Sequence, residues 1–234
     1  MQRILLVQVR PPGSFPERHE RECIKRRLPE AVELVPFNVF SAGGGVDWFE
    51  SAKGCDAFVM GGSGSVSVHD DVVSEWRAAS SRFFDQALKS QLPGFCICFG
   101  HQLLATHLGG EVVRDPARRE AGTVDIETVN ADPLFAKRAP RFSAHQGHSD
   151  HVVAAPAGTT LLARNESSPI QALRVDGTNT YSTQFHPDFL ATEARARYAE
   201  IFGTGDDAQV AMSKFDPERD GDTQTLLTEW WNAL

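Results

Sequence analysis

Short apolar runs, separated by polar or glycine-rich breaks, set the pattern of the first hundred residues. The run at residues 3–9 (RILLVQV) is nearly continuous, as expected of a central parallel strand that is covered on both faces. A further strand is predicted at residues 33–37 and buried strands at 55–60 and 95–98, and apolar residues at helical spacing predict helices at residues 16–28 and 72–88. A short helix capped by Asp47 is predicted after a loop at residues 38–45.

From residue 111 onward the pattern changes to shorter strands. These are predicted at residues 111–113, 122–129, 161–163, 170–175 and 180–185. Asp176-Gly177 between the last two is a hairpin signal. We expect a helix at residues 191–202, a break at 203–207 and a final apolar-faced helix at 224–234.

Composition bounds the class of protein. At 234 residues the chain is long enough for one sizeable core, so we expect a single α/β domain. A formal net charge of −8 argues against nucleic acid as a main partner. No stretch approaches the length of a membrane span, and the first apolar run is too short for a signal peptide. Four cysteines without disulfide spacing indicate a reducing compartment, hence the cytoplasm.

Cys98 lies where an apolar strand turns directly into a helix. The run ends at Gly100, and Leu103, Leu104 and Leu108 then follow at helical spacing. A side chain on such a turn is pushed out of the sheet, and the helix N-terminus is expected to lower its thiol pKa. Cys98 could equally be a buried small hydrophobe. The nucleophile interpretation therefore needs a base, an orienting acid and an oxyanion hole.

A candidate base and acid follow the predicted strand at residues 180–185. His186 is stiffened by Pro187 and has the carboxylate of Asp188 two residues on. A cysteine nucleophile needs such a base, and the base needs a third group to fix its tautomer. Gly61 and Gly62, directly after another strand, offer backbone N–H groups for a phosphate or an oxyanion. Neither phosphate-binding glycine pattern is complete in this turn.

Three histidines, His145, His148 and His151, recur at every third position and raise the possibility of a metal site. Helical zinc pairs usually carry a glutamate between the ligands, and Gly147 disfavours a helix here. We therefore expect no metal at this segment and interpret it as a substrate-binding loop.

Four segments together resemble the class I (triad-type) glutamine amidotransferase domain, especially stand-alone members similar to the glutaminase domain of GMP synthetase. They are residues 60–66 (MGGSGSV), 98–105 (CFGHQLLA), 148–152 (HSDHV) and 184–189 (QFHPDF). The resemblance covers residues 1–203 and leaves 204–234 as a helical extension expected to pack on the same domain. It implies a doubly wound, mostly parallel mixed sheet in a flavodoxin-like three-layer arrangement, with a smaller antiparallel portion and no cofactor.

The same resemblance assigns catalytic roles. Cys98 would attack the side-chain amide carbon of glutamine. His186 would act as base and then as the acid that protonates ammonia, with Asp188 orienting it. The backbone N–H groups of Gly62 and Phe99 would form the oxyanion hole.

The resemblance also assigns the amino-acid end of glutamine to a group of polar residues: Gln102, His148, Ser149 and Asp150. Three positions depart from the family pattern. Asp188 stands where Glu is usual, Cys96 where Gly is usual, and Ser63 where Pro is usual. Without that proline, we expect the turn at residues 61–66 to be flexible.

Three functions are compatible with these residues. The first is a glutaminase that releases ammonia through a γ-glutamyl thioester. The second is a γ-glutamyl peptidase that uses the same triad on another γ-glutamyl compound. The third is an inactive regulatory module, which an intact triad disfavours. No P-loop or obvious ATP site is present in the sequence, so a glutaminase would have to serve a synthetase on a separate polypeptide.

Overall fold

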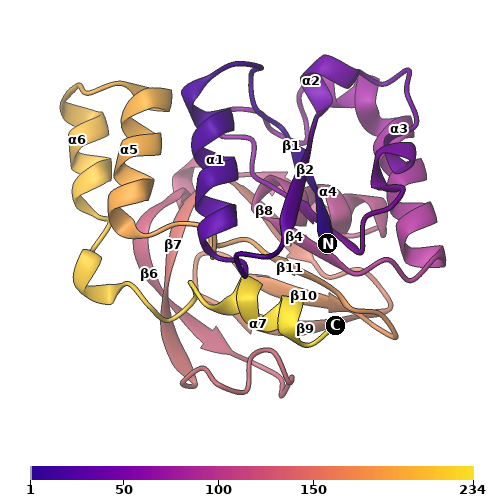
Figure 1. Cartoon of the computed structure of the whole chain (residues 1–234). Helices are drawn as coiled ribbons and strands as arrows, with labels where there is room; N and C mark the ends of the chain where they lie inside the picture. Colours follow the sequence, from indigo (N-terminus) through magenta and orange to yellow (C-terminus); the bar gives the residue numbers. More distant parts are fainter. Residues whose placement is uncertain (1) are drawn as a thin grey trace.

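The computed structural model describes residues 2–234 and shows one α/β domain (Figure 1). The strands are β1 (Arg3–Gln8), β2 (Glu33–Asn38), β3 (Ala57–Met60), β4 (Gly94–Ile97), β5 (Glu111–Arg114), β6 (Glu120–Thr128), β7 (Arg141–His148), β8 (Asp150–Ala154), β9 (Thr159–Arg164), β10 (Ala172–Val175) and β11 (Thr180–Thr183). The α-helices are α1 (Phe15–Arg26), α2 (Val39–Ala42), α3 (Asp71–Lys89), α4 (Phe99–His107), α5 (Ala191–Phe202), α6 (Asp206–Ser213) and α7 (Leu226–Asn232). Three short 3₁₀ helices are η1 (Trp48–Ala52), η2 (Pro116–Arg118) and η3 (Pro217–Arg219).

The main sheet has nine strands in the order β2-β1-β3-β4-β11-β10-β9-β6-β7. Strands β2, β1, β3, β4 and β11 pair in parallel, and the remaining pairs are antiparallel. Strands β5 and β8 form a separate antiparallel pair. The predicted α/β domain with a mixed sheet, flanking helices and a smaller antiparallel portion is therefore confirmed.

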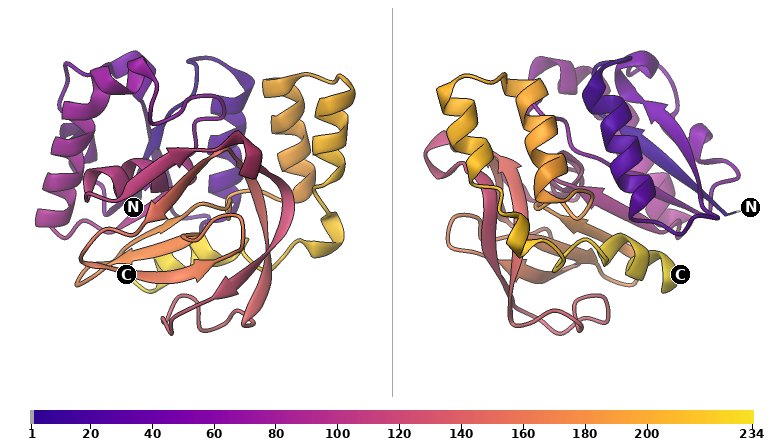
Figure 2. Two further views of the ribbon diagram at one scale, coloured as in Figure 1. Left: turned by 180° about the vertical axis from the view of Figure 1, so that it is seen from behind. Right: turned by 60° about the vertical axis from the view of Figure 1, so that its left-hand side comes forward.

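Strand β1 shows why the parallel part of the sheet needs helices on both faces. Ile4 and Leu6 pack into the cluster that contains residues of α1 and α7, whereas Leu5 and Val7 pack into the cluster that contains residues of α3 and α4. Successive side chains of a strand point to opposite faces, so an all-apolar strand must be covered twice. Figure 2 shows the resulting layers from two further sides.

The C-terminal segment packs onto the same core. The Trp230 ring on α7 lies 5.6 Å from that of Phe95 on β4, edge to face, and its Nε1 donates to the carbonyl of Asn179 at 3.1 Å. Helices α5 and α6 lie side by side next to α1 (Figure 1). No helix among residues 2–234 is both long and apolar enough to cross a membrane.

Three predictions of local structure are wrong. The loop expected at residues 38–45 contains the one-turn helix α2 (Val39–Ala42), which the Asn38 side chain caps by accepting from the backbone N–H groups of Phe40 and Ser41. Residues 144–151, expected to be a loop, belong to strands β7 and β8, with only Ser149 between them. The interior positions of β7 include His145, Gln146 and His148, so an apolar alternation that would reveal a strand is absent. The break expected at residues 203–207 is interrupted by α6, in which only Ala208 is buried.

Candidate active site

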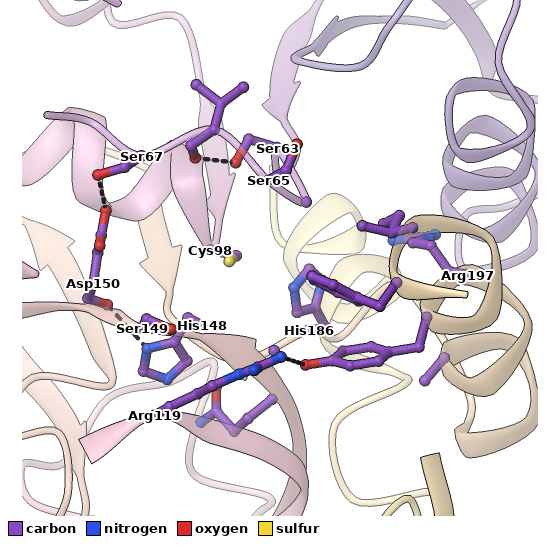
Figure 3. A pocket seen from close by; sticks show the side chains of 18 of the residues that line it. Ser63, Ser65, Ser67, Cys98, Arg119, His148, Ser149, Asp150, His186 and Arg197 are labelled. Atoms are coloured by element: carbon purple, nitrogen blue, oxygen red, sulfur yellow. Dashed lines mark hydrogen bonds between the residues drawn. The ribbon is translucent and has the colours of Figure 1, made fainter. Parts of the chain in front are cut away.

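A pocket of about 260 Å³ opens beside the carboxyl ends of β1, β3, β4 and β11 (Figure 3). Cys98 and His186, predicted from separate segments, both line it. The order of the strands explains the meeting, because β4 and β11 are parallel neighbours and each candidate follows the end of its strand. Figure 3 shows the Cys98 sulfur between the turn that carries Ser63 and the His186 ring.

Cys98 has a strained backbone. Its φ of 53° and ψ of −101° place it in a region that residues other than glycine rarely occupy, at a typical cost of about 1–3 kcal/mol. Its N–H donates to the carbonyl of Thr183 at 2.8 Å, and α4 begins at Phe99. A Cβ on Gly100 would lie 2.7 Å from the carbonyl oxygen of Met60, so only glycine fits there. The predicted strand-to-helix elbow is confirmed as a local structure.

The thiol pKa of Cys98 moves in the direction opposite to our expectation. Burial raises this pKa to about 12, although the Arg10 charge and the Phe99 backbone N–H act to lower it. The lowered value expected from the helix terminus is therefore wrong, because desolvation is the larger effect. At neutral pH the thiol keeps its proton, so nucleophilic attack would require a base that removes it.

His186 is held in one orientation by a buried carboxylate. Its Nδ1 donates to Oδ1 of Asp188 at 2.8 Å, and the backbone N–H of His186 donates to the carbonyl of His145 at 2.9 Å. The second oxygen of Asp188, Oδ2, accepts from Nη1 of Arg197 at 2.9 Å. With Nδ1 protonated, the Nε2 lone pair of His186 is available to accept a proton.

The charges in this trio follow from their surroundings. Burial lowers the pKa of His186, outweighing the opposing effect of Asp188. Burial alone would raise the pKa of Asp188, but Arg197 and His186 together hold it well below its usual range. A neutral imidazole beside an ionised carboxylate is the state that a general base requires.

Gly62 lies between the two candidate catalytic side chains. A Cβ built there would meet Cε1 of His186 at 3.2 Å, Nη2 of Arg10 at 3.2 Å and Cβ of Cys98 at 3.6 Å. A Cβ on Gly61 would clash with the Glu20 carboxylate at 2.6 Å. Glycine at position 62 therefore lets the main chain run directly beside Cys98 and His186, and glycine at position 61 leaves room for Glu20.

The turn after β3 is tied down by side chains. The Ser63 hydroxyl donates to the carbonyl of Val66, and the Ser67 hydroxyl donates to Oδ2 of Asp150. The backbone N–H of Ser67 also donates to Oδ2 of Asp70 at 2.8 Å. These contacts do not support the flexible turn expected from the missing proline, because hydrogen bonds constrain the segment instead.

The four predicted substrate-binding residues all line the pocket: Gln102, His148, Ser149 and Asp150. Nε2 of Gln102 donates to the carbonyl of Asp150 at 3.0 Å, which connects α4 to the β7–β8 turn. Nδ1 of His148 donates to the same carbonyl at 2.9 Å. The group is thus a connected wall of the pocket rather than a mobile loop.

The basic residues of the pocket were not predicted from the sequence: Arg10, Arg114, Arg119 and Arg197. Arg10 follows the end of β1, and this position in the sequence could have indicated that it lies at the pocket. It pairs with Glu20, Nη2 to Oε1, at 2.8 Å. Arg119 donates to the Tyr198 hydroxyl at 2.8 Å. Nothing in the sequence pattern marks Arg119 as part of the pocket.

The three spaced histidines do not form one group. Nε2 of His145 lies 2.6 Å from Oδ1 of Asp220, and its Nδ1 lies 3.0 Å from the Thr123 hydroxyl. His148 and His151 instead gather with Glu120. Among residues 2–234, these last three are placed so that they could hold a metal ion.

A cysteine at a strand-to-helix elbow, a carboxylate-paired histidine just after the neighbouring strand and a mixed, helix-flanked sheet together define an α/β protein of the amidotransferase class. The chain belongs to the glutamine amidotransferase class-I family, whose model matches residues 26–204.

Similar proteins agree with this assignment. The chain is 33% identical over 144 residues to a glutamine-hydrolysing GMP synthase subunit of Sulfurisphaera tokodaii, covering 62% of this chain and 73% of the relative. It is 35% identical over 116 residues to the GMP synthase subunit of the same description from Thermococcus kodakarensis, covering 48% of this chain and 61% of the relative. Against the glutamine-hydrolysing GMP synthase of Thermomicrobium roseum it is 35% identical over 180 residues, covering 73% of this chain but only 30% of the relative.

Solved structures show the same fold. A glutamine amidotransferase from Thermotoga maritima superposes with a TM-score of 0.72 at 20% identity, over 97% of this chain and 93% of the other. A glutamine amido transferase from Methylobacillus flagellatus gives a TM-score of 0.73 at 19% identity, over 100% and 94% of the two chains.

Proposed function

We propose that this chain hydrolyses the side-chain amide of L-glutamine to glutamate and ammonia through a γ-glutamyl thioester on Cys98. The observation that carries the proposal is the meeting of Cys98, on its strained elbow, with the Asp188-paired His186 in one pocket. Membership of the class-I family and the description of its relatives as glutamine-hydrolysing support the choice of substrate.

In the first half-reaction, Sγ of Cys98 attacks the amide carbon while Nε2 of His186 takes the thiol proton. The raised thiol pKa makes this transfer necessary, and the lowered pKa of His186 keeps the base neutral and ready. The developing oxyanion accepts hydrogen bonds from the backbone N–H groups of Gly62 and Phe99. The imidazolium then gives its proton to the departing nitrogen, and ammonia leaves.

In the second half-reaction, water attacks the thioester carbon with His186 again as base. Collapse of the second tetrahedral intermediate breaks the C–S bond, releases glutamate and returns the proton to Sγ of Cys98. Asp188 fixes the tautomer of His186 through both steps and stabilises the imidazolium. The pocket wall formed by Gln102, His148, Ser149 and Asp150 holds the amino-acid end of the substrate.

Ammonia and glutamate release from glutamine by the purified chain tests the proposal. Wild type should form both products in equal amounts, and Cys98→Ser should form neither above background. A stable, folded wild-type chain that releases no product from glutamine or from any γ-glutamyl amide would leave the regulatory module as the better interpretation.

A γ-glutamyl peptidase is the second candidate, and one observation favours it. Arg114 and Arg119 line the same pocket. Ammonia needs no cation to recognise it, whereas a peptide leaving group carries a carboxylate that a guanidinium can bind. A panel of γ-glutamyl amides assayed beside glutamine separates the two candidates.

A synthetase on a separate polypeptide would receive the ammonia, as the description of two relatives as single subunits of GMP synthase suggests. Residues 1–203 would form the amidotransferase domain and 204–234 an extension of it, in keeping with a family match that ends at residue 204. Four free cysteines are consistent with a reducing, cytoplasmic location.

A further inference from the structure

Three potential metal ligands gather at the pocket wall, outside the Cys98–His186–Asp188 trio. Glu120 on β6, His148 on β7 and His151 on β8 each offer one ligand atom, and these atoms all lie within 4.8 Å of one another. All three residues are buried, with exposed fractions of 6%, 6% and 0%. The cluster joins two strands of the main sheet to one of the small sheet.

The contacts of His148 leave open what lies between its Nε2 and the Glu120 carboxylate. Its Nδ1 lies 2.9 Å from the carbonyl oxygen of Asp150, which can only accept, so Nδ1 carries a proton. Its Nε2 lies 3.1 Å from Oε2 of Glu120. Oε1 and Oε2 of Glu120 also accept from the side-chain amides of Asn165 and Gln171, so this carboxyl is ionised. Nε2 must therefore bear a second proton or share a cation with Glu120.

His151 selects between these alternatives. Among residues 2–234, neither of its ring nitrogens has a hydrogen-bond partner, and the side chain is fully buried. Buried polar groups are rarely left unpaired. Its ring packs edge to face against that of His148, with centroids 4.8 Å apart. A second proton on His148 would satisfy Glu120 but would leave His151 beside a new positive charge and still without a partner.

We propose that Oε2 of Glu120, Nε2 of His148 and one ring nitrogen of His151 bind a single divalent transition-metal ion, with zinc the best match. One ion satisfies the lone pair of His148, the carboxylate and the unpartnered His151 together. Two imidazoles and one carboxylate suit zinc, whereas magnesium and calcium prefer ligand sets made of oxygen. The three protein ligands leave a fourth position for water.

The surroundings of the cluster resemble the outer shell of a metal site. Metal-binding histidines usually donate their other N–H to a carbonyl or carboxylate, as His148 does to Asp150. Asn165 and Gln171 hold the carboxylate of Glu120 in place. Because Asp150 belongs to the 148–150 turn, the ion would fix the pocket wall. This role is independent of whether the pocket hydrolyses glutamine.

The test is zinc binding by the full chain carrying Cys98→Ser, which removes a competing thiol. After treatment with a chelator, the protein should bind one equivalent of Zn²⁺ in competition with a chromophoric chelator. Co²⁺ should give the visible absorption of a tetrahedral site without a thiolate charge-transfer band. His151→Phe should weaken zinc binding by more than the roughly 10–100-fold typical of losing an outer-shell partner.

One further variant and two controls sharpen the result. Glu120→Gln keeps the shape of its side chain and should also weaken binding, which covers the case that His151→Phe fails to fold. Glu127→Gln on the same strand, paired at the surface with Arg164, and His107→Phe on α4 should bind zinc as the parent does. The proposal would be overturned if the parent bound no stoichiometric zinc. It would also be overturned if His151→Phe and Glu120→Gln both bound zinc as tightly as the parent.

Discussion

Arg197 binds the oxygen of Asp188 that His186 leaves unused. Nη1 of Arg197 lies 2.9 Å from Oδ2 of Asp188, and Nδ1 of His186 lies 2.8 Å from Oδ1. Both carboxylate oxygens are thus fixed, one from α5 and one from the segment after β11. The arginine therefore fixes the position of the carboxylate that holds the His186 ring.

The first prediction concerns Asp188→Ala. Cys98→Ser and His186→Ala should reduce turnover to near background. Asp188→Ala should retain measurably more turnover, because the His186 imidazole is then misaligned but still present. The same change leaves the buried Arg197 charge unpaired, which should lower the free energy of unfolding by about 3–5 kcal/mol. Glutamine turnover and denaturant unfolding, measured on the same preparations, check both effects.

A surface pair provides the control for stability. Asp125 is largely exposed and pairs with Arg219, so Asp125→Ala should cost no more than about 1 kcal/mol. Wild-type turnover by a folded Asp188→Ala variant would show that another residue orients His186.

The second prediction is that a glutamine-analogue electrophile, such as a diazo-ketone, labels Cys98 and leaves Cys96 unmodified. Strand alternation alone would place the two thiols on one face. The structure instead packs Cys96 in the cluster that contains residues of α3 and α4, and turns Cys98 to the pocket at the elbow. Peptide mapping after labelling locates the modified residue, with Cys96→Ser as the control that should label normally. Label on Cys96 would contradict the assignment.

The third prediction concerns pH. A base must be neutral to accept a proton, and burial lowers the pKa of His186 below its ordinary value of 6.5. Activity should therefore persist at pH 6.5 and fall only as the pH drops through the lower, folded-state value. The acid limb of kcat/KM for glutamine measures this midpoint.

Arg197→Gln should move that midpoint upward, because the Arg197 charge contributes to lowering the pKa of His186. Arg195→Gln, from the same helix, removes a guanidinium that hydrogen-bonds backbone carbonyls of Met212 and Phe215 and should leave the midpoint unchanged. An acid limb above pH 6.5 in wild type would contradict the predicted environment of His186.

The sequence was most informative where local pattern and chemistry coincide. The apolar run before Cys98 and the helical spacing after Gly100 predicted the elbow, because each depends on neighbouring residues only. Strand β7 escaped prediction because its interior positions include His145 and Gln146, whose burial is possible only through partners far along the chain.

Electrostatic properties were harder to predict for the same reason. The thiol pKa of Cys98 depends chiefly on burial by distant segments, which outweighs the local helix terminus. Arg197 lies nine residues beyond Asp188, on the helix α5, and no motif in the sequence marks that contact. The cluster of Glu120 with His148 likewise requires the pairing of β6 with β7.

The last prediction separates the two candidate substrates through Arg119. Its guanidinium lies 5.4 Å from the centre of the Phe202 ring and donates to the Tyr198 hydroxyl, so it is already oriented at the rim of the pocket. If the leaving group is an amino acid, Arg119 can bind its carboxylate through a charge-assisted hydrogen bond, commonly worth about 1.5–3 kcal/mol. Arg119→Met should then reduce kcat/KM for a γ-glutamyl dipeptide by roughly 10–150-fold and change glutamine hydrolysis little. Arg164→Met, at an exposed pair with Glu127, is the matched control and should affect neither substrate. Equal losses for both substrates would mean that Arg119 shapes the pocket as a whole. Efficient hydrolysis of the dipeptide by wild type, at about 10⁴ M⁻¹s⁻¹ or more with weak action on glutamine, would favour the peptidase over the glutaminase.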